Sequence, residues 1–108
     1  MTTIACPYEK EYKDFIDSLK NSKPNNTNSD ILNALWFAKK SQWDKSHNIT
    51  QEINSYFGYW MHAYLHRLEG DQFNANFWYS KANIDPIKSS LDEEWEMLLG
   101  HVLEYELK

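Results

Sequence analysis

Residues 60–82 constrain the fold more than any other part of the chain. Gly70 and Asp71 stand in the middle of this segment, and apolar residues at helical spacing lie on both sides of them. Glycine is the usual residue just beyond a helix end, and aspartate is a favoured N-cap. The segment therefore predicts a helix ending at Glu69, a tight turn, and a second helix over residues 72–82.

The same kinds of signal predict helices in the rest of the chain. Pro7 suits the first turn of a helix over residues 8–19, which a polar loop over residues 21–29 follows. Ser29 is the expected N-cap of a second helix, and Ser41 that of a third over residues 42–56, because Asp44 has the spacing of a capping box. We expect a fourth helix to begin near residue 57 or 58, and a last one to follow Ser90 and Glu93, another capping box.

These helices predict an all-α fold of five to six helices in a single domain, residues 1–108. Short connections make neighbouring helices antiparallel, so the second with the third and the fourth with the fifth form two stacked hairpins, flanked by the terminal helices. The spacing of small residues and Gly70 in the second hairpin is similar to that of tetratricopeptide hairpins. Aromatic residues make up 16% of the chain, which predicts a core built largely from rings.

Charge and composition narrow the classes of partner. The net charge is −5 and no run of Lys or Arg is present, so we expect no binding to nucleic acid. No segment is apolar over the length of a membrane span, and the N-terminus lacks the pattern of a secretory signal. Cys6 is the single cysteine, so an internal disulfide is excluded and a cytoplasmic location is expected. A monomer and a homodimer both remain open.

The segment His66-Arg-Leu-Glu-Gly-Asp71 and the residues after it resemble a family of small, uncharacterised bacterial proteins. The signature of that family is His-Arg-x-Glu-Gly-Asp-x-x-Asn-Ala-x-Tyr-Trp-Tyr-x-Arg-Ala, and a Trp-Asp-x-Ala-His block usually precedes it. Here that block is residues 43–47, and the resemblance covers roughly residues 35–83. The departures are Ser46 for alanine, Phe77 for tyrosine and Lys81 for arginine. The resemblance implies a coherent site without naming a reaction.

Histidines are the residues that most suggest chemistry. His62 and His66 are four apart and share one helix face, with Glu69 three residues further on. His47 lies on the preceding helix, which should pack against theirs. These four residues are a candidate site for a divalent metal such as zinc. The alternatives are acid–base catalysis by the same groups, or histidine rings that serve as partly buried packing residues.

A second candidate set suits ligand binding. Stacked helical hairpins present a groove, and Arg67 in such a groove could hold a peptide or a small anionic ligand. The residues expected to bind a ligand in it are Trp60, Tyr64, Arg67, Asn74 and Tyr79. The alternatives are that the aromatics form core and that Arg67 pairs with Glu69, Asp71 or Asp92. A helical binding or interaction module is therefore the leading expectation, and a metal-binding protein or a small enzyme is its rival.

Overall fold

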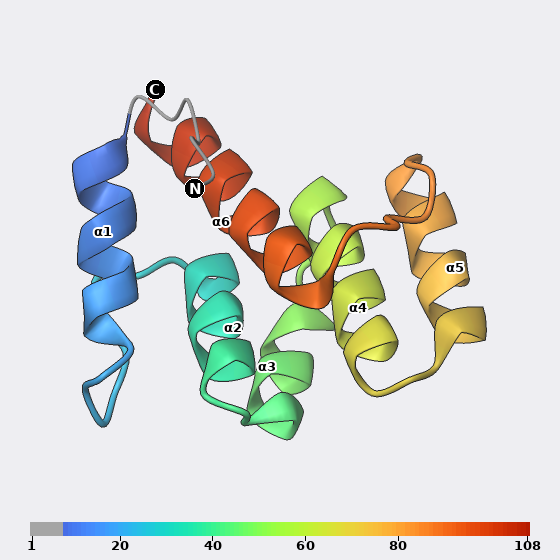
Figure 1. Ribbon diagram of the computed structural model, residues 1–108, viewed down its shortest axis with the longest axis horizontal. Helices are drawn as coiled ribbons and strands as arrows, with labels where there is room; N and C mark the ends of the chain where they lie inside the picture. Colours follow the sequence, from blue (N-terminus) through green and yellow to red (C-terminus); the bar gives the residue numbers. More distant parts are fainter. Residues whose placement is uncertain (1–7) are drawn as a thin grey trace.

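Six α-helices and no strands make up residues 8–108, the part of the chain that the computed structural model describes (Figure 1). The helices are α1 (Glu9–Ser18), α2 (Asp30–Lys39), α3 (Trp43–Thr50), α4 (Tyr56–Leu68), α5 (Gln72–Ala82) and α6 (Leu91–Leu107). The prediction of an all-α fold with five to six helices is confirmed. Pro7, the expected first-turn residue of α1, lies outside the described residues.

Most of the helix ends follow the capping signals of the sequence. The Ser29 side chain accepts a hydrogen bond from the backbone N–H of Leu32 at the start of α2. At the start of α6, Ser90 and Glu93 form the complete capping box. Gly70 has φ 88°, a left-handed conformation that side chains disfavour, and it ends α4 as predicted.

The prediction of Ser41 as an N-cap is wrong. Ser41 has φ 61° and belongs to the end of α2, where its N–H donates to Ala38 O and the N–H of Gln42 donates to Phe37 O. This pair of bonds is a Schellman motif, which closes the carbonyls of the last helical turn. The residue before α3 is Gln42, whose side chain makes no capping bond. Ser41 therefore adopts the left-handed conformation that closes α2 and does not act as the N-cap that the Ser-x-x-Asp pattern suggested.

The third helix is shorter than the sequence predicts. It ends at Thr50, whereas the sequence predicted a continuous helix over residues 42–56. The chain turns so that the backbone of Ile53 packs against Gly58 in the first turns of α4. A Cβ atom on Gly58 would lie 1.9 Å from the Ile53 carbonyl oxygen, so only glycine permits this approach. The fourth helix accordingly begins at Tyr56, one or two residues earlier than expected.

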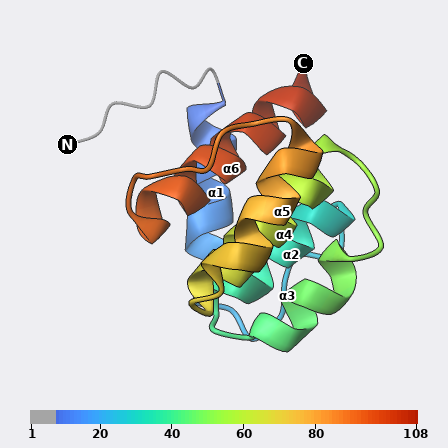
Figure 2. The ribbon, with the colours of Figure 1, turned by 90° about the vertical axis from the view of Figure 1, so that its right-hand side faces the viewer.

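The helices pack in sequential pairs that α6 joins together. α2 packs on α3, α4 packs on α5, and α4 also contacts α2 and α3. α6 runs diagonally over this group and contacts α1, α2 and α4 (Figure 1). Figure 2 shows α5 in front of α4, with α2 and α3 behind them. The similarity to tetratricopeptide hairpins stays a prediction.

Tryptophan rings tie the helices to one another through the core. The indole N–H of Trp95 on α6 donates to Leu35 O on α2, and that of Trp43 on α3 donates to Leu65 O on α4. Trp36 donates in the same way to Ser18 O at the end of α1. Each of these rings fills space between helices and also satisfies a carbonyl oxygen, so the aromatic residues set how the helices sit against one another.

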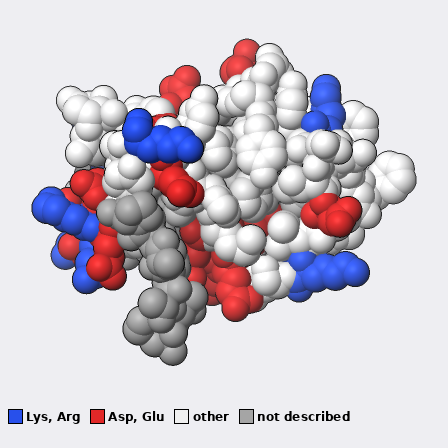
Figure 3. Space-filling model, turned by 90° about the horizontal axis from the view of Figure 1, so that it is seen from above, with Lys and Arg blue, Asp and Glu red and all other residues white. Residues whose placement is uncertain are grey.

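The surface of the described residues mixes both signs of charge. On the face shown in Figure 3, Lys and Arg side chains lie among Asp, Glu and uncharged side chains. No helix within residues 8–108 has the length and apolar character needed to cross a membrane.

Candidate metal centre

Three of the four histidines meet where α3 packs against α4. His47 comes from α3, and His62 and His66 come from consecutive turns of one face of α4. One ring nitrogen from each of the three lies within 4.8 Å of the others. The structure therefore brings together the three histidines that the sequence singled out.

The contact between His47 and His62 is the shortest within this cluster. Their Nε2 atoms lie 3.1 Å apart, and their rings are nearly perpendicular, with an interplanar angle of 87°. Two nitrogen ligands of one tetrahedral zinc ion, each at about 2.0–2.1 Å from it, would lie about 3.3 Å from each other. Without an ion, the same distance suits a hydrogen bond from one Nε2–H to the other Nε2. The pair thus has a spacing that a shared metal ion requires.

Two indole rings enclose the histidines. Trp43 stacks on His47 with ring centroids 4.7 Å apart, and Trp78 from α5 stacks on His62 at 3.8 Å. Trp43 is held in place by its hydrogen bond to Leu65 O. Trp43 thus covers one face of His47 and Trp78 one face of His62, which leaves the ring edges to interact with one another.

The enclosure favours the neutral form of the imidazoles. Burial, and then the neighbouring His47 and His66, lower the pKa of His62 to about 4. Burial also lowers the pKa of His47, with a further contribution from His66. A metal ion binds the neutral imidazole through its lone pair, so these two residues are in a ligating form at neutral pH.

Glu69 contacts a histidine rather than the centre of the cluster. Its Oε2 atom lies 2.8 Å from Nδ1 of His66. A carboxylate can only accept a hydrogen bond, so Nδ1 carries the proton and Nε2 of a neutral His66 keeps its lone pair. Carboxylates commonly orient metal-binding histidines in this way. The sequence suggested Glu69 as a fourth ligand, and the structure gives it the geometry of an orienting group.

Most of the expected ligand groove is filled by core packing. Trp60, Tyr64 and Tyr79 are all buried, and Trp60 and Tyr79 donate hydrogen bonds to Glu94 on α6. Asn74 is not directed at a ligand either, because its side-chain amide donates to Asp71 at 2.6 Å and its backbone N–H donates to the same carboxylate. Trp60 and Tyr79 therefore pack in the core and Asn74 caps a helix, whereas Tyr64 borders a separate pocket beside α2 and α6.

Arg67, the fifth of these residues, forms an ion pair with Glu94, a residue that was not among the predicted site residues. Its Nη1 atom lies 2.7 Å from Oε1 of Glu94, a fully buried carboxylate on α6, and its Nη2 atom donates to the Ser89 carbonyl oxygen. Trp60 and Tyr79 donate to the other oxygen of Glu94 at 3.0 and 2.6 Å. Arg67 therefore pairs with Glu94 and not with Glu69, Asp71 or Asp92, the three acidic partners expected for it.

A signal for Glu94 was present in the sequence. Glu94 stands three residues after Leu91 and four before Leu98, which places it on the apolar stripe of the last helix. An acidic residue on such a stripe needs a buried partner, and Arg67 is that partner.

The fold and the site define a small all-helical protein that carries a three-histidine cluster between two helices. No protein-family model, curated protein or solved structure matches the chain. The resemblance of residues 35–83 to a bacterial family accordingly stays a prediction.

Proposed function

We propose that this protein binds one divalent transition-metal ion, of which zinc is the leading candidate, through His47, His62 and His66. The observation that carries the proposal is the convergence of three ring nitrogens from two helices within 4.8 Å. Imidazole is a preferred ligand of zinc, copper and nickel, whereas magnesium and calcium favour oxygen. A purely nitrogen set therefore favours the first group of ions.

Three protein ligands leave one position of a tetrahedral ion free. In zinc proteins, closed sites with four protein ligands are structural, and sites with three protein ligands and a bound water are catalytic. The cluster supports the second arrangement, because Glu69 is engaged with Nδ1 of His66. A water molecule on the ion would be acidified and available for hydrolysis or for exchange with an anion.

Two other functions compete with this proposal. The histidines can be packing residues alone, since His47 and His62 each stack on an indole ring. The protein can also be an interaction module, which the sequence favoured on the strength of a groove at Trp60 and Arg67. Burial of the groove residues and the ion pair of Arg67 with Glu94 make metal binding the stronger proposal.

Metal binding is tested on protein made without a histidine tag and stripped with a chelator. We expect calorimetry to show one zinc ion per chain, and Co²⁺ to give the visible absorption of a tetrahedral nitrogen site. His47→Gln and His66→Gln should each weaken binding by about a hundredfold, or about 2.7 kcal/mol. The control is His101→Gln, which changes the fourth histidine, an exposed residue on α6.

Circular dichroism confirms that each variant retains its helices before binding is measured. Equal zinc affinity of the wild type and the His47 and His66 variants would assign binding to another site. The absence of zinc and cobalt binding by the folded wild type would leave the histidines as packing residues.

A further inference from the structure

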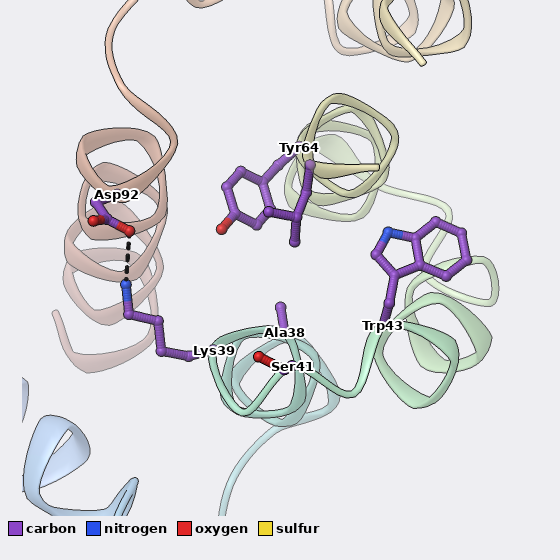
Figure 4. A pocket seen from close by; sticks show the side chains of 7 residues that line it. Ala38, Lys39, Ser41, Trp43, Tyr64 and Asp92 are labelled. Atoms are coloured by element: carbon purple, nitrogen blue, oxygen red, sulfur yellow. Dashed lines mark hydrogen bonds and ion pairs between the residues drawn. The ribbon is translucent and has the colours of Figure 1, made fainter. Parts of the chain in front are cut away.

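A pocket opens at the C-terminal end of α2, between α2, α4 and the first turn of α6 (Figure 4). Its volume is about 420 Å³, within the range of small-molecule sites. The lining residues are Ala38, Lys39, Ser41, Trp43, Tyr64, Leu68 and Asp92. No histidine lines the pocket, so it is distinct from the histidine cluster, although Trp43 contributes to both.

Tyr64 supplies an unused polar group to this pocket. The residue is only 3% exposed, and Figure 4 shows its ring entering from α4 with the hydroxyl directed toward the side of Lys39 and Asp92. No residue among the described 8–108 forms a hydrogen bond with this hydroxyl. The hydroxyl oxygen is open to the solvent of the pocket, where a ligand that accepts its hydrogen bond would take the place of water.

The hydroxyl is a donor under all ordinary conditions. Burial, followed by the negative charges of Glu94 and Asp92, raises the pKa of Tyr64 to about 12. A protonated phenol in this position favours a ligand that carries an acceptor, such as a carboxylate oxygen.

Both signs of charge stand at the edge of the pocket. Lys39 Nζ lies 3.2 Å from Asp92 Oδ1, and the Asp92 side chain is 82% exposed. An exposed ion pair contributes little to stability, so a ligand can replace it at small cost. A ligand with one positive and one negative group would leave neither Lys39 nor Asp92 unpaired. The rest of the wall consists of Ala38, Leu68 and the Trp43 ring, which are apolar, together with Ser41.

We propose that this pocket binds a small zwitterion with an apolar side chain, that is, an α-amino acid or a close relative of one. Its carboxylate accepts hydrogen bonds from Lys39 and the Tyr64 hydroxyl, and its ammonium group pairs with Asp92. Its side chain packs against Trp43 and the aliphatic wall. The site acts independently of the histidine cluster and binds without a metal.

The test titrates metal-free, chelator-treated protein with L-leucine and follows amide and indole chemical shifts by NMR. Two analogues isolate the charges, because 4-methylpentanoate lacks the ammonium group and 3-methylbutylamine lacks the carboxylate. We expect leucine to shift the signals of Ala38, Leu68 and the Trp43 indole, and each analogue to bind about tenfold more weakly.

Substitutions of the polar lining residues show which side chain binds which group of the ligand. Tyr64→Phe retains the ring and loses the hydroxyl. Tyr64→Phe and Lys39→Met should each weaken leucine binding about tenfold and leave the affinity for 3-methylbutylamine unchanged. Asp92→Asn should weaken binding of leucine and of the amine but not of 4-methylpentanoate. Lys13→Met, on the exposed side of α1, is the control and should bind leucine as the wild type does.

Three results would overturn the proposal: no leucine-induced shifts at the pocket, analogues that bind as well as leucine, or unchanged leucine affinity in Tyr64→Phe and Lys39→Met. Because all titrations are made without metal, a failure of the metal proposal does not alter their interpretation.

Discussion

The Nε2 atoms of His47 and His62 lie 3.1 Å apart although fifteen positions of sequence separate the two residues. The contact joins α3 to α4. The Trp43 ring stacks on His47, and the Trp78 ring stacks on His62. Packing of aromatic rings thus holds two neutral imidazoles edge to edge. This geometry supports the proposal of a site prepared for a metal ion.

Glu69→Gln should weaken zinc binding about tenfold without removing it. Glutamine can still accept the hydrogen bond from Nδ1 of His66 but, without a charge, accepts it more weakly than a carboxylate does. Loss of an orienting partner typically costs about 10–100-fold in metal affinity. Competition with a chelating dye measures the change. Glu52→Gln, on the exposed turn after α3, is the control. An unchanged affinity for Glu69→Gln would show that the contact is a surface ion pair only.

Stability of the metal-free protein should fall as the pH decreases from about 6.5 to about 4. His62 has a pKa of about 4 in the folded protein, so in this window the unfolded chain takes up a proton that the folded chain does not. The stabilisation is complete above the pKa of His62 in the unfolded chain. It is lost progressively as the pH falls toward the pKa of His62 in the folded protein, and the free energy of unfolding decreases by at most about 3 kcal/mol.

Urea unfolding at several pH values in the presence of a chelator measures this loss. His62→Gln should make the dependence on pH shallower. An NMR titration in which the ring protons of His62 respond near pH 6.5 would contradict the expected shift.

Arg67→Met should destabilise the fold by about 3–5 kcal/mol, because it leaves the Glu94 carboxylate buried without a cation. Adding Glu94→Gln should recover much of that loss, since the amide oxygen is neutral and can still accept hydrogen bonds from Trp60 and Tyr79. Urea midpoints for the two single variants and the double variant give the coupling energy. Additive effects of the two substitutions would show that the pair is not coupled.

Gly58→Ala should destabilise the protein by about 3 kcal/mol or more, because the new Cβ atom would meet the Ile53 carbonyl at 1.9 Å. Gly100→Ala is the matched variant, in the interior of α6, where a Cβ atom meets nothing within 4 Å. It should stabilise the protein by about 0.5–1 kcal/mol through helix propensity. Thermal unfolding of both proteins measures the contrast, and similar losses in the two would contradict the close approach of Ile53 to α4.

Much of the secondary structure could be predicted because its signals are local. Gly70 and Asp71 mark a helix end and a helix start through bonds to residues within one turn, and the same holds for Ser90 with Glu93. The prediction failed at Ser41, where a plausible N-cap is the left-handed residue that closes α2. Two local signals competed at that point, and the bonds at the end of the preceding helix decided between them.

The candidate site could be predicted only in part. The spacing of His62 and His66 places both on one face of a helix whatever the helix packs against. His47 was added because consecutive helices pack together, and the structure brings its ring to theirs. Glu94 was missed because its partner, Arg67, is 27 residues away and belongs to another helix.

The sequence by itself determined the helical class, most helix ends and the pairing of the two histidines on α4, because each depends on residues one turn apart. Only the tertiary structure decided that His47 joins them, that Arg67 is paired with Glu94 and that the hydroxyl of Tyr64 faces a pocket. These relationships depend on how the helices lie against one another. That arrangement is set by the packing of large rings such as Trp36 and Trp95 and by the hydrogen bonds they donate across the core.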